Sequence, residues 1–131
     1  MIRVLIDENL SEYLAEGLNQ LQKPLGNSLV ITSIAKEFGK GIKDEDWIPQ
    51  WGRSSGIFIT QDLKIVTTRQ QAALLEQFNI GAFFLKVPSG YRYWDRVELL
   101  IKHWPAVVSI IEREPAPYTY FIKPGKVSKE T

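Results

Sequence analysis

The sequence predicts an α/β fold: one domain with a mostly parallel central sheet and helices on both faces. Short aliphatic and aromatic runs, typical of buried strands, alternate along the chain with segments whose apolar residues recur at helical spacing. Because strand–helix–strand units join parallel strands through right-handed crossovers, this alternation favours a parallel sheet covered on both sides. The length of 131 residues fits one domain, and 44% hydrophobic with 24% charged residues is a globular composition.

The first half of the chain predicts two strands separated by a helix, and then a short acidic helix. Residues 3–6 and 29–34 are aliphatic, β-branched runs that indicate strands. The helix between them can be capped by Asn9 or Ser11. Acids begin a brief helix over residues 44–51, where the helix dipole favours them. The first helix is indicated by its apolar residues at three- and four-residue spacing: Leu10, Tyr13, Leu14, Leu18 and Leu21.

The second half continues the alternation. The elements expected there are strands over residues 57–60, 81–87 and 118–122 and helices over residues 69–78 and 94–113. Pro105 lies inside the last helical pattern and is expected to kink or split it. We therefore expect a domain over residues 1–122, followed by a loose basic tail over residues 123–131.

The composition excludes several kinds of chemistry. The chain has no cysteine, which excludes disulfides, thiolate zinc sites and cysteine nucleophiles. Its single histidine, His103, excludes a histidine-rich metal site. The net charge of +1 supplies no global field for nucleic acid, so such a partner would have to be held by a local patch or by metal ions.

No segment reads as a targeting signal or a membrane span. The apolar start of the chain is interrupted at Asp7-Glu8, and no apolar run approaches the roughly 20 residues that a membrane helix needs. A cytoplasmic protein with no membrane partner is the expectation.

Three acids are predicted to meet at one edge of the sheet. Asp7 directly follows the first strand, and the pair Gln61-Asp62 directly follows the strand over residues 57–60. Parallel strands end at the same edge, which is also where open α/β sheets bind ligands. Asp44 begins the helix that leads into the second of these strands, so a regular crossover brings it to that edge as well.

Carboxylates grouped without histidine or cysteine suit hard cations such as Mg²⁺ or Mn²⁺. A metal ion of this kind can activate water and stabilise charge on a phosphodiester, which is nuclease or phosphatase chemistry without a protein nucleophile. Glu8 and Asp46 are the candidates for an additional ligand.

Each of these residues also has a structural explanation. Asp7 or Asn9 can cap the first helix, Asp44 can cap the second, and Asp62 can stabilise a turn. The tryptophans fall on apolar helix faces, so core packing is favoured over base stacking for all four: Trp47, Trp51, Trp94 and Trp104. The cations near the acids in sequence either hold phosphates or form a solvated surface: Lys40, Lys43, Arg53, Lys64 and Arg69.

At these acids the sequence resembles the PIN-like domain family, specifically its VapC-type toxin branch, over nearly the whole chain. The most specific pieces are the Asp-x-x-Trp-Ile-Pro run and the Thr-x-Asp that follows a strand. The matching segments are Leu5-Ile6-Asp7-Glu8-Asn9-Leu10, Asp44-Glu45-Asp46-Trp47-Ile48-Pro49, Ile59-Thr60-Gln61-Asp62, Phe83-Phe84-Leu85 and the helix from Trp94 to Trp104-Pro105.

The resemblance implies a PIN-like fold, an Mg²⁺- or Mn²⁺-dependent ribonuclease activity, and the toxin role in a toxin–antitoxin pair. It carries Asp7, Asp44 and Asp62 over as the catalytic, metal-binding acids, with Thr60 as the hydroxyl beside the site. It also implies a homodimer whose cognate antitoxin blocks the site. The residues assigned to RNA binding are Asn9, Thr60, Lys64 and Arg69.

The sequence departs from the family pattern at one position. Many PIN domains have a further acid two residues after the one that matches Asp62, and this chain has Lys64 there. Three core acids favour one firmly held ion, with a second recruited by substrate phosphate.

Two other functions remain open from the sequence. A receiver-like phospho-accepting domain would use Asp7-Glu8 as its acidic pair, Asp62 as the phosphorylated residue and Lys86 before Pro88, but it gives Asp44 no role. A catalytically inactive PIN-like module that only binds RNA or a partner is the third hypothesis, and Lys64 keeps it open.

Overall fold

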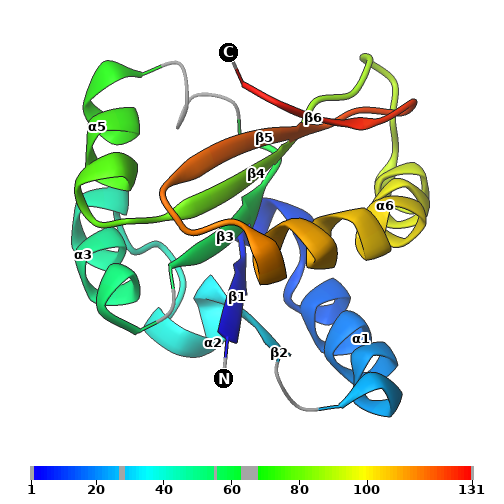
Figure 1. Ribbon diagram of the computed structural model, residues 1–131, viewed down its shortest axis with the longest axis horizontal. Coiled ribbons are helices and arrows are strands. Elements are labelled where there is room, and N and C mark those ends of the chain that lie inside the picture. Colours follow the sequence, from blue (N-terminus) through cyan, green and yellow to red (C-terminus); the bar gives the residue numbers. More distant parts are fainter. Residues whose placement is uncertain (1, 27–28, 55, 63–67, 131) are drawn as a thin grey trace.

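The computed structural model describes residues 2–26, 29–54, 56–62 and 68–130. Strands and helices alternate along the chain and build a six-stranded sheet with the order β2-β1-β3-β4-β5-β6, as Figure 1 shows. The strands are β1 (Ile2–Ile6), β2 (Leu29–Ser33), β3 (Ile57–Thr60), β4 (Gly81–Leu85), β5 (Tyr118–Ile122) and β6 (Val127–Lys129). The first five pair in parallel and β6 is antiparallel, which confirms the predicted α/β class and the mostly parallel sheet.

Helices cover both faces of the sheet. The α-helices are α1 (Glu12–Gln22), α2 (Ile34–Phe38), α3 (Asp44–Ser54), α5 (Arg69–Gln77) and α6 (Tyr93–Arg113), and 3-10 turns form η1 (Glu8–Leu10) and η2 (Lys23–Leu25). In Figure 1, α1 and α6 lie on one side of the sheet and α3 and α5 on the other.

Each face of the sheet has its own hydrophobic core. Side chains of α1 and α6 pack with Val4, Ile6, Phe83 and Ile122 in one core. In the other, Trp47, Ile48 and Trp51 of α3 pack with Leu5 and Phe58. The alternation of neighbouring residues between the two cores follows from the two-residue period of a strand that is buried on both faces.

Local signals explain where several elements begin and end. The Ser11 hydroxyl accepts hydrogen bonds from the backbone N–H groups of Tyr13 and Leu14 and so caps α1, one of the two caps expected. Ser33 caps α2 in the same way by accepting from Lys36 N–H at 3.2 Å, so β2 ends one residue before its predicted limit.

Other element predictions are corrected. β4 ends at Leu85 rather than at residue 87. Pro105 does not split α6, which runs unbroken over 21 residues, and the proline lies on the exposed side of the helix.

The prediction of a loose tail after residue 122 is wrong for Val127–Lys129. These residues pair with β5, and Lys129 Nζ lies 2.6 Å from Glu114 Oε1. The turn before β6 is also held, since Pro124 O lies 3.2 Å from His103 Nε2 on α6. Paired backbone and these side-chain contacts order a segment whose composition alone indicates flexibility.

The outer strand β2 has a side chain on its open edge. The Ile31 N–H points away from β1 and donates to Asn19 Oδ1 of α1 at 2.9 Å. Asn19 therefore satisfies a backbone donor that an edge strand otherwise leaves to solvent.

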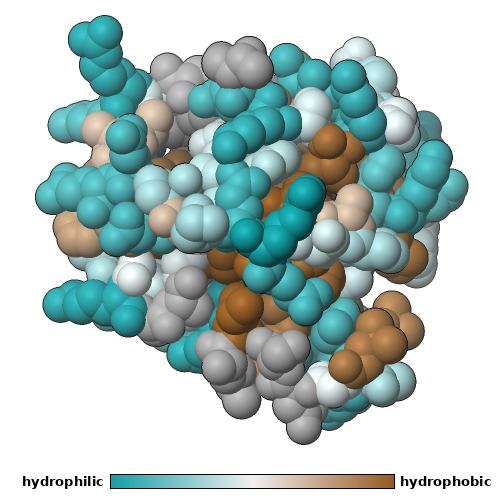
Figure 2. All heavy atoms as spheres, viewed as in Figure 1, coloured by the Kyte–Doolittle hydropathy of each residue, from teal (hydrophilic) through white to brown (hydrophobic). Residues whose placement is uncertain are grey.

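The surface in the view of Figure 2 is mostly hydrophilic, with an apolar patch over the end of α1. Leu21 and Leu25 are strongly exposed in this part of the chain. None of the helices that the structure describes is both long and apolar enough to cross a membrane.

Candidate functional site

The carboxyl ends of the central strands β1 and β3 carry two of the predicted acids. β1 ends at Ile6 and β3 at Thr60, and the two strands are parallel neighbours. The Asp7 N–H donates to Ile59 O at 3.0 Å, which continues the pairing one residue beyond the strand. Asp7 and Asp62 therefore stand at the same edge, as predicted.

Thr60 links these two acids. Its side chain is wholly buried, and its hydroxyl donates a short hydrogen bond to Asp7 Oδ2. Thr60 Oγ1 also accepts a hydrogen bond from the Asp62 backbone N–H at 2.9 Å. Thr60 therefore connects the Asp7 carboxylate to the backbone of Asp62. Its side chain has no exposed surface, which does not fit the prediction that it contacts RNA directly.

Asp44 belongs to a helix rather than to a strand end. It begins α3, and its Oδ1 accepts a hydrogen bond from Trp47 Nε1 at 3.0 Å. Trp47 is fully buried and packs on Phe58 of β3, with ring centroids 4.5 Å apart. The core thus anchors the residue that orients the Asp44 carboxylate.

The electrostatics show that the three acids share one neighbourhood. Burial raises the pKa of Asp7, the hydrogen bonds from Thr60 and from the Glu8 backbone oppose that shift, and the charges of Asp62 and Asp44 add to it. Burial likewise raises the pKa of Asp44 against the Trp47 hydrogen bond, and the charges of Asp62 and Glu45 raise it further. In the described parts of the chain no lysine or arginine forms an ion pair with Asp7 or Asp44.

The residues present fit a hard divalent cation in their chemistry. Carboxylate oxygens are its preferred ligands, and a cation would balance negative charge that burial and mutual repulsion disfavour. The acids do not form a closed cage, because the described residues contain no group of three His, Cys, Asp or Glu side chains placed to hold a metal ion. An ion at this edge would therefore keep water or substrate ligands, as Mg²⁺ commonly does.

The remaining predicted residues differ in their places. Asn9 is exposed beside Asp7 and donates to its Oδ2 at 3.4 Å. Glu8 is also exposed, and its Oε1 accepts from Gly41 N–H at 3.2 Å, so it ties η1 to the segment before α3. The exposed Asp46 has no contact with the three acids in the described ranges. Its backbone N–H donates to Lys43 O at 3.0 Å, and its carbonyl accepts from Gln50 Nε2 at 3.0 Å.

The two cations assigned to RNA binding are Arg69 and Lys64. Arg69 is exposed at the first position of α5, with no described contact to the acids. Lys64 lies outside the described residues.

Two residues that support the site, Gln61 and Trp47, were not predicted in that role from the sequence. Gln61 Nε2 donates to Asn9 O at 3.0 Å and so joins the end of β3 to η1. Trp47 was predicted for the core only, although its place three residues after Asp44 on a helix is the spacing at which such side chains meet.

Comparison with known proteins identifies a family. No curated protein and no solved structure matches the chain. A model of the family described as PIN-like domain matches residues 2–87, which includes Asp7, Asp44 and Asp62. The match ends before the helix from Trp94 to Pro105, which the resemblance had included. With about two-thirds of its length matched and an α/β sheet of the expected kind, the chain belongs to the PIN-like domain family, whose fold is of the nuclease type.

Proposed function

We propose that this protein is a metal-dependent endoribonuclease of the VapC-type toxin branch that hydrolyses RNA phosphodiesters with carboxylate-held Mg²⁺ or Mn²⁺. The observation that carries the proposal is the Thr60 hydroxyl, which joins Asp7 and Asp62 at the carboxyl edge, within electrostatic reach of Asp44. Membership of the PIN-like family supports the nuclease class.

The roles of the residues follow from their contacts. Asp7, Asp44 and Asp62 supply the ligand oxygens, and Thr60 and Trp47 hold the first two carboxylates in orientation. A bound Mg²⁺ or Mn²⁺ would activate a water and stabilise charge on the phosphate. Asn9 and Arg69 are exposed and are assigned to RNA contact, and Lys64 is assigned to it by sequence. A cognate antitoxin that blocks this edge, a homodimer and a cytoplasmic location complete the proposal.

The test is cleavage of unstructured RNA with Mg²⁺ or Mn²⁺ by the wild type and by Asp7→Asn and Asp62→Asn. We expect both variants to lose activity, and EDTA to abolish it in the wild type. Glu16→Gln is the matched control, because Glu16 is an exposed acid on α1 that is not a candidate ligand. If the Asp7 and Asp62 variants cut RNA as fast as the control, the acids are not the site.

The receiver-like alternative shares the strand order β2-β1-β3-β4-β5, so topology does not separate the two functions. The side chains do. Lys86, which that scheme would use beside the phosphorylated Asp62, has its Nζ over the Phe121 ring at 5.2 Å. Asp44, which it leaves without a role, lies within electrostatic reach of Asp7 and Asp62. Absence of Asp62 labelling by acetyl phosphate is the expected result.

The inactive-module alternative is favoured by one observation, the lack of a closed cage of metal ligands among the described side chains. Calorimetric titration with Mn²⁺ separates it from the nuclease. Heat of binding that disappears in Asp7→Asn supports the nuclease, and no binding at millimolar metal supports the inactive module.

A further inference from the structure

The start of α6 and the two residues before it combine aromatic and basic side chains at the edge that carries the acids. This segment reads Tyr91-Arg92-Tyr93-Trp94, and α6 begins at Tyr93. β4 is the parallel neighbour of β3, so its carboxyl end and the chain that follows lie on the same side of the sheet as Asp62. The segment lies beyond the family match, which ends at residue 87.

Trp94 is exposed, against the prediction that it packs in the core. Its side chain is 75% exposed, whereas Trp47, Trp51 and Trp104 are buried. Tyr93 packs against it edge to face, with ring centroids 5.5 Å apart and planes at 77°. This contact restrains the indole without covering it, so a flat ligand can stack on a surface that is already oriented.

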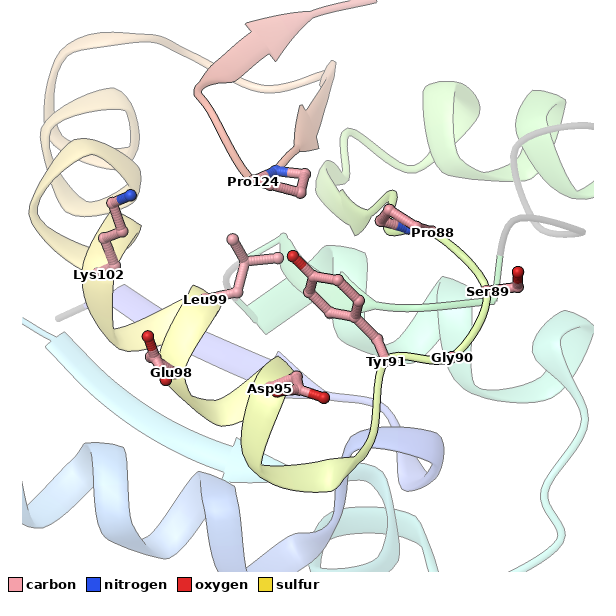
Figure 3. Close-up of a pocket in the computed structure, with 9 residues that line it drawn as sticks. All are labelled: Pro88, Ser89, Gly90, Tyr91, Asp95, Glu98, Leu99, Lys102 and Pro124. Carbon is pink, nitrogen blue, oxygen red and sulfur yellow. The ribbon is translucent and has the colours of Figure 1, made fainter.

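A pocket of about 500 Å³ adjoins this segment, and Tyr91 is its central aromatic residue (Figure 3). The Tyr91 ring stands between the loop at Pro88 and the side of α6. The pocket is also lined by the apolar residues Leu99 and Pro124 and by the charged side chains of Asp95, Glu98 and Lys102. Such a pocket offers one flat apolar surface and hydrogen-bonding groups at its rim, the combination that an unpaired nucleobase requires.

One exposed cation within the segment suits a polyanion. Arg92 is exposed and forms no ion pair with a described residue, and neither does Arg96, whose Nε has no hydrogen-bond partner there. Lys102 adds a positive charge at the pocket, whose acids are Asp95 and Glu98, and Asp95 accepts the Arg92 backbone N–H at 2.8 Å. Lys86 and Lys123 lie over Phe121, which packs with the core on the other face of the sheet, so they are not part of this site.

We propose that Tyr91–Trp94 is a stacking site for unpaired bases of the RNA substrate, with Trp94 as its principal residue and the exposed Arg92 holding the backbone. The inference rests on the proposed ribonuclease function and assigns the residues on which the bases stack. In a duplex the base faces are covered by their neighbours, so neither Trp94 nor Tyr91 could stack on them.

The test measures binding without cleavage. A labelled, unstructured RNA oligonucleotide is titrated with the protein in EDTA, and fluorescence anisotropy gives the affinity. We expect Trp94→Ala to weaken binding about tenfold and Trp94→Phe to retain most of it, because stacking needs an aromatic face. Ile101→Ala is the matched control, since Ile101 is also an exposed apolar residue of α6 and should leave the affinity unchanged. A duplex of the same sequence should bind more weakly and be insensitive to Trp94→Ala.

The outcomes separate this inference from the proposed function. Equal RNA affinity of the wild type and Trp94→Ala overturns it, even if the wild type cleaves RNA. Equal affinity combined with a changed oligomeric state in gel filtration also overturns it and makes the exposed indole a protein interface. Binding that depends on Trp94, in a protein that cuts no RNA with Mn²⁺, supports the stacking site and contradicts the nuclease.

Discussion

Thr60 shows how one buried hydroxyl can organise a charged site. A threonine at the end of a buried strand has a side chain that must find partners inside the protein, and here both partners belong to the acid site. The donated and the accepted hydrogen bond together link Asp7, directly after β1, to Asp62, the second residue after β3. The precision of the site therefore depends on an uncharged residue that touches neither solvent nor substrate.

Replacement of this hydroxyl by a methyl group is expected to impair both stability and activity. Thr60→Val keeps the shape but leaves the Asp62 N–H and the Asp7 carboxylate without their partner, which should destabilise the fold by about 1–3 kcal/mol. By analogy with residues that orient metal ligands, Mn²⁺ affinity or RNA cleavage should fall about 10–100-fold. Chemical denaturation and a cleavage assay measure the two effects. Thr119→Val on β5 is the control, and equal behaviour of both variants would refute the positioning role.

The charged form of Asp7 is expected to lower the stability of the folded, metal-free protein. Burial and the nearby acids raise its pKa in the folded protein above 3.8, so the folded state binds the proton more tightly than the unfolded state does. Its contribution to stability is therefore greatest at low pH and falls as pH rises from 3.8 through the folded pKa.

Asp7→Asn should consequently raise the thermal stability of the metal-free protein at pH 7, since the amide can still accept the Thr60 hydrogen bond without carrying charge. The gain should shrink as pH is lowered, because the wild-type carboxyl then becomes neutral too. Calorimetric melting temperatures across this pH range provide the measurement, with Asp46→Asn as the exposed control. A lower melting temperature for Asp7→Asn at pH 7 would contradict the stated cause of the shift.

At the scale of elements, the contact between α3 and α5 supports the position of Asp44. Gly52, near the end of α3, lies so close to the chain after α5 that a Cβ atom there would meet Phe78 O at 2.3 Å. Only glycine permits this approach. It brings α3, with Asp44 at its start, against the helix whose first residue is Arg69.

Two glycine substitutions should therefore have opposite effects. Gly52→Ala should destabilise the protein by about 1–3 kcal/mol, because the backbone of Phe78 has to move. Gly17→Ala in α1 meets nothing within 4 Å and should stabilise it by about 0.5–1 kcal/mol through helix propensity. Denaturant unfolding with a common m-value gives both numbers. A neutral Gly52→Ala would show that α3 and α5 can separate freely.

The sequence predicts elements well where the signal is local. The Ser11 cap, the strand over residues 57–60 and the amphipathic α6 follow from short-range patterns. The short strand β6 could not be predicted, because its stability comes from pairing with β5 and from the bond of Lys129 to Glu114. α2 was missed for a related reason, since Ile34 continues the aliphatic run of β2 while Ser33 caps a helix.

For the whole molecule, the order of the strands creates the site. β1 and β3 are neighbours at the centre of the sheet, although β2 and the helices α1, α2 and α3 separate them in sequence. The rule that parallel strands share an edge was enough to predict that Asp7 and Asp62 lie near each other. It could not predict Thr60 as their link or Trp47 as the partner of Asp44, because both depend on side-chain packing between distant segments. For Trp94 the helical pattern predicted burial, and the end of the core at the start of α6 leaves it exposed.

A divalent cation should stabilise the molecule as a whole if the acids bind it. Binding to the folded state alone raises the free energy of unfolding with concentration, by about 2.7 kcal/mol at a hundred times the dissociation constant. We expect Mn²⁺ to raise the melting temperature in a saturable manner, and Asp7→Asn to lose most of the response. Thermal shift measurements with and without EDTA provide the check. An equal response of wild type and variant would place the ion elsewhere.

The Asn19 side chain on the open edge of β2 bears on how the protein behaves at high concentration. An outermost strand with free backbone groups is a template on which another molecule can add its own strand, and so begin an ordered aggregate. The Asn19 side chain already accepts the hydrogen bond of the Ile31 N–H, which is a donor that an added strand would use. At the opposite margin of the sheet, β6 is only three residues long and carries Lys129. Both edge strands therefore discourage edge-to-edge pairing between the sheets of two molecules, which opposes aggregation at high concentration.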